Sequence, residues 1–219
     1  MKFKKILDLT QPFFHNMPGP PAFPLFKNNI VNIQVEDGFN MEKLDFVTHC
    51  GTHIDAPYHF INSGRTLSDL SPNDLVGDAI ILDFRGKKND ENISGIDLMK
   101  YDNRIKQGSI VILYTGFCEK RGFNEDYIKY PIWLDLSGAK YLVQKKVKGI
   151  GIDHFSLSGT TKERSFPIHI EILSNDIWIL EDLRLTEELL AEPVWTLIVM
   201  PMLIKNGTGA PTRVFAIKY

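Results

Sequence analysis

Residues 48–60 read Thr-His-Cys-Gly-Thr-His-Ile-Asp-Ala-Pro-Tyr-His-Phe and hold three of the chain's six histidines together with one carboxylate. Imidazole and carboxylate groups suit zinc, manganese and ferrous iron, and a catalytic site needs about three protein ligands with one position open for water. The candidate ligands are His49, His53, Asp55 and His59. This window therefore predicts a divalent-metal site.

The spacing of these residues requires a bend in the backbone. All four candidates carry odd numbers, so an extended strand would place them on one face. On a straight strand with a rise of about 3.3 Å per residue, however, His49 and Asp55 would stand roughly 20 Å apart. Gly51 can adopt conformations that are closed to other residues, so we expect the strand to turn there.

Two other interpretations of the window compete with this one. His49 and His53 share the i, i+4 spacing of the His-Glu-x-x-His zinc helix, but Cys50 stands where that motif requires Glu, and Thr52 and Ile54 are poor helix formers. The histidines could instead form a hydrogen-bonded structural cluster without metal. Three histidines within eleven positions around a carboxylate favour the metal site.

Two further candidates, His169 and Glu181, are weaker when they are judged from the residues alone. Pro167 could occupy the first turn of a helix that contains His169, and a structural histidine fits that helix as well. Glu181 ends an apolar run that predicts a buried strand, but Asp182 could be the functional acid instead. A buried carboxylate there could pair with Arg184 as easily as with a metal.

The pattern His-x-Gly-Thr-His-x-Asp-Ala-Pro-x-His-Phe resembles the signature of the metal-dependent cyclase family, which includes bacterial kynurenine formamidases and isatin hydrolases. Every fixed position of that signature is filled between His49 and Phe60. The spacing from His169 to Glu181 is similar to the family's second ligand segment. The resemblance covers nearly the whole chain, since it also includes residues 7–12, 150–153, 179–183 and 207–217.

The resemblance implies a site for one or two divalent ions, with zinc favoured over manganese. His49, His53 and Asp55 would bind the first ion. Asp55, His169 and Glu181 would hold the second, and Glu181 could touch both. Residues 1–219 would form a single domain of this family.

The resemblance also implies a reaction. Metal-activated water would hydrolyse an arylformamide such as N-formylkynurenine, a step in tryptophan catabolism. His59 would take the acid-base role and pass a proton to the departing nitrogen. Alternatives on the same metal are hydrolysis of an isatin-like cyclic amide, and cyclisation or dehydration. A non-catalytic metal-binding or ligand-binding protein is the alternative from another class, although it would need no uncommitted histidine beside the metal.

The proline-rich segment 12–26 could be an irregular surface loop, or its rigid backbone and aromatic side chains could form an apolar wall over the substrate or reach a neighbouring subunit. Phe14 and Phe23 are the candidate substrate-lining residues in this segment, and His154, at the end of another apolar strand, is a third. Kynurenine formamidases usually place a tryptophan here, but residues 16–23 contain none. This departure concerns the substrate and leaves the metal chemistry unchanged.

The composition is typical of a globular enzyme that acts on a small molecule. The chain is 43% hydrophobic with a net charge of −2, and its basic residues show no nucleic-acid footprint. No apolar run approaches the roughly 18 residues of a membrane span. The basic residues 1–5 lack a following apolar stretch, and Cys50 and Cys118 give no disulfide framework, so we expect a cytoplasmic protein.

Short apolar strands alternate with a few helical segments. Helices are expected over residues 138–147, with Ser137 as the N-cap, and over about 96–105. This mixture predicts an α/β (α+β) domain with a mixed β-sheet. The resemblance implies a swivelling β/β/α architecture and a homodimer or higher homo-oligomer. The expected strands cover residues 6–9, 30–35, 44–47, 79–84, 110–114, 149–152, 177–180, 196–200 and 213–217.

Overall fold

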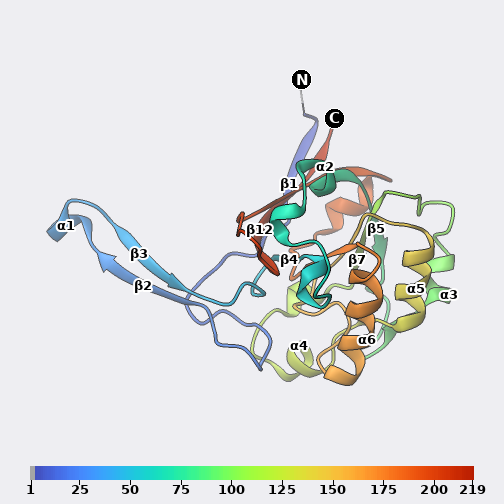
Figure 1. Ribbon diagram of the computed structural model, residues 1–219, viewed down its shortest axis with the longest axis horizontal. Coiled ribbons are helices and arrows are strands. Elements are labelled where there is room, and N and C mark those ends of the chain that lie inside the picture. Colours follow the sequence, from blue (N-terminus) through green and yellow to red (C-terminus); the bar gives the residue numbers. More distant parts are fainter. Residues whose placement is uncertain (1–2) are drawn as a thin grey trace.

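A computed structural model describes residues 3–219, which form a mixed sheet in the order β1-β12-β11-β5-β7-β9-β10-β4 (Figure 1). Strand β4 also pairs with β12, so the sheet closes into a barrel and confirms the predicted mixed α/β class. The strands are β1 Lys5–Asp8, β4 His53–Asp55, β5 Val76–Asp83, β7 Ile110–Tyr114, β9 Gly149–Ile152, β10 Trp178–Glu181, β11 Trp195–Pro201 and β12 Gly209–Lys218.

Side chains alternate along the strands between two hydrophobic cores. On β5, Ala79 and Ile81 point into the barrel, whereas Ile80 and Leu82 point outward. The outer core is covered by three helices, α3 Gly95–Met99, α5 Leu136–Gln144 and α6 Lys162–Leu173 (Figure 1). Because the central strands are buried on both faces, they form near-continuous apolar runs in the sequence.

One end of each of two helices differs from the prediction. Helix α5 is capped by Asp135, whose carboxylate accepts a hydrogen bond from the Gly138 N–H at 2.8 Å. Ser137, the expected cap, instead accepts a hydrogen bond from the backbone N–H of Gly95. Helix α3 is capped by Ser94 and ends at Met99, because the residues after it form turns rather than the helix predicted to continue to residue 105.

The prediction that Pro167 occupies the first turn of a helix is wrong, because α6 begins at Lys162 and places Pro167 in its interior. Proline has no N–H to donate to the carbonyl four residues earlier. The helix continues past it because Ile168 and Ile172 are buried in the outer core.

All nine predicted strands have counterparts in the structure, and Gly51 takes the expected turn with φ 58°. Three short strands are not among the nine, β4 His53–Asp55, β6 Asn92–Ile93 and β8 Trp133–Leu134. Of these, β4 lies in the window 48–60, which was expected to be extended and to turn at Gly51. No helix within residues 3–219 combines the length and apolar character needed to cross a bilayer. The remaining helices are short, namely α2 Pro72–Leu75, α4 Glu125–Lys129, η1 Pro57–His59, η2 Leu67–Asp69, η3 Phe117–Lys120 and η4 Glu187–Ala191.

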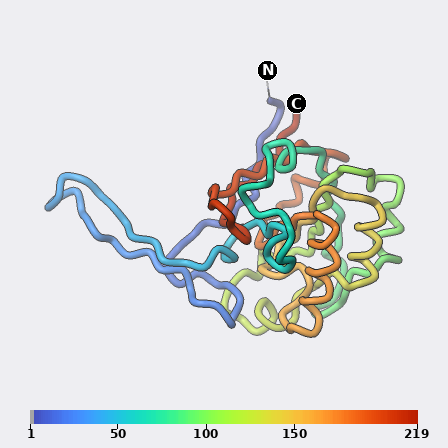
Figure 2. Tube along the Cα trace, in the orientation of Figure 1, coloured from blue at the N-terminus to red at the C-terminus, as the bar shows by residue number. Residues whose placement is uncertain are grey.

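A two-stranded arm, residues 27–45, projects from the barrel (Figures 1 and 2). It consists of β2 Lys27–Asn32, the short helix α1 Gln34–Asp37 and β3 Met41–Asp45. The predicted strand over residues 30–35 therefore ends too late, because its apolar residues are exposed and the chain already turns at α1.

Candidate metal centre

Strands β4 and β10 place three of the predicted ligands on one face of the sheet. His53 lies directly opposite Glu181 in the antiparallel pair, and Asp55 lies two residues further along β4. Ile54 between them points into the barrel core, so both polar neighbours point outward, toward α6.

The turn at Gly51 brings His49 back to these residues. A Cβ at Gly51 would come within 2.5 Å of the Phe13 ring, and its positive φ also favours glycine. His49 Nδ1 consequently lies 2.6 Å from Asp55 Oδ1, and His49 Nε2 lies 2.9 Å from Thr208 Oγ1.

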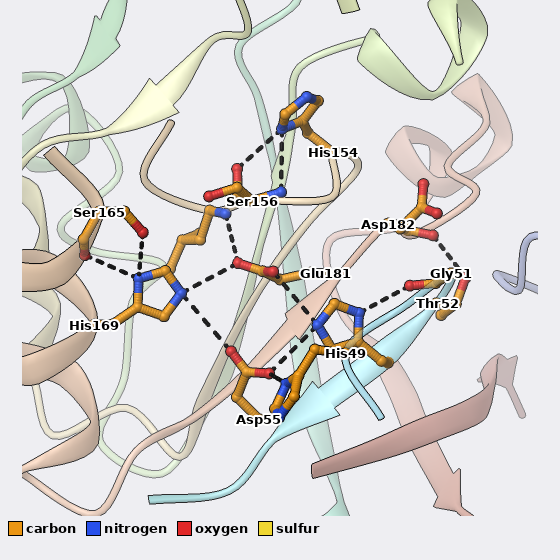
Figure 3. Close-up of polar contacts among 12 residues, drawn as sticks. His49, Gly51, Thr52, Asp55, His154, Ser156, Ser165, His169, Glu181 and Asp182 are labelled. Carbon is orange, nitrogen blue, oxygen red and sulfur yellow. Dashed lines mark hydrogen bonds and ion pairs between the residues drawn. The ribbon is translucent and has the colours of Figure 1, made fainter. Parts of the chain in front are cut away.

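Helix α6 supplies His169 from the opposite side. Its Nε2 atom lies 3.4 Å from Glu181 Oε1 and 3.7 Å from Asp55 Oδ2 (Figure 3). The structure therefore brings together all five predicted ligands, which are His49, His53, Asp55, His169 and Glu181.

Two of the imidazole rings are oriented by backbone carbonyls. His53 Nδ1 lies 2.8 Å from the Gly51 carbonyl, and His169 Nδ1 lies 3.0 Å from the Ser165 carbonyl. The Nε2 atoms are left facing the carboxylates, with His53 Nε2 3.3 Å from Asp55 and 3.5 Å from Glu181. This is the arrangement in which a second partner fixes the tautomer of a metal-binding histidine.

In the absence of a metal, protons on the histidines would balance the negative charges of Asp55 and Glu181. Burial alone would lower the pKa of His53, but the bond to Asp55 and the charges of Asp55 and Glu181 raise it to about 9. Burial alone would also lower the pKa of His169, but the bond to Glu181 and the charges of Glu181 and Asp55 together raise it. Burial alone would raise the pKa of Asp55, but the charges of His49 and His59 hold it well below its ordinary value.

The donor set fits a divalent cation. His53, Asp55, His169 and Glu181 are each at most 5% exposed, and within residues 3–219 neither carboxylate pairs with a lysine or an arginine. Ligand atoms of His53, Asp55 and Glu181 lie within 4.8 Å of one another. Buried carboxylates require a cation, and histidines whose Nε2 atoms face them are the ligands that zinc and manganese prefer.

His59 lies at the edge of this cluster. Its ring stacks on His49 at a centroid distance of 3.7 Å and makes no hydrogen bond to any residue between 3 and 219. Burial lowers the pKa of His59 to about 4, although the charge of Asp55 acts in the opposite direction. Ligand atoms of His49, Asp55 and His59 also lie within 4.8 Å of one another, so this geometry allows a ligand role as well as proton transfer.

The predicted substrate-lining residues have different outcomes. His154 is fully buried and bonded through Nε2 to the Tyr127 carbonyl at 2.8 Å, and it points away from the cluster, so its predicted substrate-lining role is wrong (Figure 3). Phe23 lines a small crevice that also includes His49. Phe14 is exposed and lies against the Arg121 guanidinium.

Asp182 is a structural neighbour of the site rather than its acid. Its carboxylate accepts hydrogen bonds from Arg121 Nη2 at 2.8 Å and from the Tyr127 hydroxyl at 3.0 Å. It has a left-handed φ of 54°, and its carbonyl accepts the Thr52 hydroxyl at 2.6 Å. The alternative that Arg184 is the cation for a buried carboxylate here is wrong, because Arg121 has that role.

Sequence reasoning missed Thr208 and Arg121. The sequence signal for Thr208 is the glycine on either side of it, since glycines often mark places where two backbones approach closely. In the structure, a Cβ at Gly209 would come within 2.2 Å of the Ile54 carbonyl and 2.7 Å of His49 Cε1. Arg121 lies in a loop with no periodic pattern, so nothing in the sequence distinguishes it.

The sequence of the chain is similar to those of known proteins. The Cyclase family model, described as "Putative cyclase", matches residues 7–158. The chain is 29% identical to kynurenine formamidase of Bacillus anthracis over 97% of both chains, and 30% identical to that of Geobacillus thermodenitrificans over 94% of both.

Two solved structures have similar folds. Isatin hydrolase A from Labrenzia aggregata has a TM-score of 0.87 at 22% identity, with 98% of this chain and 93% of that chain covered. A predicted metal-dependent hydrolase from Bacillus stearothermophilus has a TM-score of 0.81 at 26% identity, with 98% of both chains covered.

Proposed function

Because the chain belongs to the cyclase family, we propose that it is a metal-dependent hydrolase whose substrate is an arylformamide of the N-formylkynurenine type. The kynurenine formamidase relatives and the isatin hydrolase fold support an enzyme that acts on C–N bonds other than peptide bonds. One observation carries the proposal most directly. Two buried carboxylates face the Nε2 atoms of His53 and His169 with no lysine or arginine paired to them in the described chain.

The metal would be held by His49, His53, Asp55, His169 and Glu181, with zinc favoured and manganese as the alternative, as one or two ions. A bound divalent cation would lower the pKa of a water molecule and polarise the substrate carbonyl. The chain supplies the rigidity of the site. Gly51 and Ser165 hold two imidazoles through their carbonyls, and the Leu157 N–H donates to Glu181 Oε1 at 2.6 Å.

His59 is the group that would move a proton. In formamide hydrolysis the water oxygen bonds to the carbonyl carbon, the C–N bond breaks, and the amine leaves with a proton while formate forms. His59 can receive the proton that water loses and deliver it to the nitrogen, because no residue of the described chain occupies its ring nitrogens.

The proline-rich segment would hold the aryl group. Phe23 and Met17 of this segment share a crevice with His49 and Cys50, so an apolar surface lies beside the candidate ligands. The crevice itself has a volume of only about 10 Å³, so the aryl group would lie outside it against the half-exposed ring of Phe23, where it would bury apolar area.

Metal content and turnover test the proposal together. Protein purified without an affinity tag would be analysed by plasma mass spectrometry and assayed with N-formylkynurenine before and after chelation. We expect one or two equivalents of zinc or manganese and turnover that chelation abolishes and metal restores. Turnover of isatin but not of the formamide would reject the arylformamide substrate, and protein without metal would reject the metal centre.

A matched pair of histidine variants controls the assay. His53→Asn removes a buried candidate ligand and should abolish both metal binding and turnover. His15→Asn removes an exposed histidine that bonds only to the backbone of Asn28, and it should change neither.

A further inference from the structure

A cavity of about 520 Å³ lies between the root of the arm and the strands β1 and β12. Three aromatic rings line it, those of Phe13, Phe26 and Phe46. The rings of Phe13 and Phe26 meet edge to face with centroids 5.3 Å apart, and those of Phe26 and Phe46 are 5.8 Å apart. Cavities of this size with mainly apolar and aromatic linings are typical of small-molecule sites. The rings favour a ligand that contains an aryl group.

Gln11 contributes an amide without a partner to this apolar lining. The residue is 7% exposed, and its backbone N–H donates to Thr52 Oγ1 at 2.8 Å. Its side-chain amide makes no hydrogen bond to any residue between 3 and 219. A buried amide costs free energy unless it is hydrogen-bonded, so this one indicates a ligand with a polar group.

The charged residues of the lining leave one cation uncompensated. Asp8 and Arg213 pair with each other at the rim, with Arg213 Nε 2.9 Å from Asp8 Oδ2. Arg184 also lines the cavity and is exposed, and its guanidinium has no hydrogen bond or ion pair within the described chain. Because a guanidinium binds a carboxylate through two parallel N–H groups, the excess positive charge favours a carboxylate monoanion.

The two free donors come from adjoining segments of the wall. Thr10 and Leu183 form an antiparallel bridge, and the Arg184 N–H donates to the Leu9 carbonyl at 2.8 Å. Arg184 is therefore held opposite a residue that lies only two positions before Gln11. A carboxylate placed beside this pair of segments would accept hydrogen bonds from both side chains.

The cavity adjoins the candidate metal centre but is lined by none of the five candidate ligands. Gln11 and Thr212 in its wall donate through their backbone N–H groups to Thr52, at 2.8 and 2.9 Å. Thr52 thus stands between the cavity and His53. A molecule in the cavity would contact this wall rather than an ion at the metal centre, which makes the two sites separable by experiment.

We propose that this cavity is a second binding site of the chain, specific for a small aromatic monocarboxylate. The carboxylate accepts hydrogen bonds from the Arg184 guanidinium and the Gln11 amide. The aryl group packs against the rings of Phe13, Phe26 and Phe46. The site does not depend on the proposed hydrolase function, since it uses none of the groups assigned to that reaction.

Isothermal titration calorimetry with 2-naphthoate tests the site on metal-loaded and on chelated protein. We expect saturable binding at one equivalent with the same Kd in both preparations, and a Kd at least about tenfold higher for the neutral 2-naphthamide. Binding that chelation abolishes would place the probe at the metal centre and overturn the proposal. Equal affinity for the acid and the amide, or no saturable binding, would overturn it as well.

A matched pair of charge variants locates the probe. Arg184→Gln should raise the Kd for 2-naphthoate about tenfold, because it removes a charge-assisted hydrogen bond. Lys140→Gln removes the same charge from the exposed face of α5, on the other side of the molecule from the arm, and should leave the Kd unchanged (Figure 1). Equal affinities of these two variants would refute the site.

The amide is tested by Gln11→Leu, which keeps the volume of the side chain and removes its donor. This variant should raise the Kd several-fold, and thermal denaturation would show that it is folded. An unchanged Kd would remove Gln11 from the site and contradict the proposal. A wild-type Kd that rises with protein concentration would show that a second copy of the chain covers the cavity, and would also overturn it.

Discussion

The ring of His59 lies against His49 and makes no hydrogen bond within the described chain. This geometry is compatible with two roles, proton transfer and metal binding. If it moves a proton, His59→Asn should lower kcat by about 10²–10⁴-fold and leave the metal content unchanged. Steady-state kinetics and metal analysis on the same preparation would separate the roles. Loss of metal in this variant would show that His59 is a ligand.

Gly209 is required by the close approach of β12 to β4. A methyl group there would collide with the Ile54 carbonyl and with the ring of His49, so Gly209→Ala should destabilise the fold by about 1–3 kcal/mol and displace His49. Chemical denaturation would measure the loss. Gly86→Ala is the control, because nothing lies within 4 Å of the position its Cβ would take. Equal stability of the two variants would contradict the prediction.

Arg121 and Asp182 form a buried ion pair, and Asp182 directly follows the candidate ligand Glu181 in the chain. The side chains of the two residues are 7% and 0% exposed. Arg121→Met would leave the Asp182 carboxylate buried without its cation, so we expect a loss of about 3–5 kcal/mol in the free energy of unfolding. Lys129→Met breaks the exposed pair with Glu125 and should have little effect. Similar losses in both variants would show that the buried pair has no special role.

At the scale of elements, apolar patterning predicted seven of the eight strands of the barrel, because their side chains alternate between two buried cores. The exception is β4, which lies in the histidine-rich window 48–60. The arm has the same local pattern without a core of its own, so the boundaries predicted for β2 were wrong. Pro167 was predicted in the first turn of α6, whereas the helix begins five residues earlier, at Lys162. The sequence does not indicate this start, because residues 162–165 are polar and give no apolar periodicity. Local pattern therefore identified elements well and their ends poorly.

The position of each site residue along the chain explains which of them the sequence could reveal. His49, His53, Asp55 and His59 lie in one short window, so their proximity follows from the chain itself. His169 reaches the site through helix packing, and only the family resemblance singled it out in advance. Their roles as ligands and proton carrier stay predictions.

The start of α5 gives a direct test at this scale. Asp135→Ala removes the carboxylate that accepts the Gly138 N–H and should cost about 0.5–2 kcal/mol. Ser137→Ala should cost less, because that hydroxyl does not cap the helix. Thermal denaturation of the two variants would show the order, and the reverse order would restore Ser137 as the principal cap.

For the whole molecule, the metal and the fold should depend on each other. A cation that binds only the folded chain stabilises it by about 2.7 kcal/mol at a hundredfold excess over Kd. Chelation should therefore lower the Tm by about 5–10 °C for a chain of this size, and added zinc or manganese should restore it. His53→Asn should show no shift on chelation. An unchanged wild-type Tm would argue against tight binding by the folded state.

Strand β4, three residues long, both closes the barrel and carries His53 and Asp55. Its partners are β10 and β12, which are made much later than β4 as the chain is synthesised. Contacts of such long sequence separation form late in folding. A nascent chain that has not yet released β12 from the ribosome therefore has an open seam beside His53 and Asp55, and the proposed ligand set would be complete only after the C-terminal strand is in place.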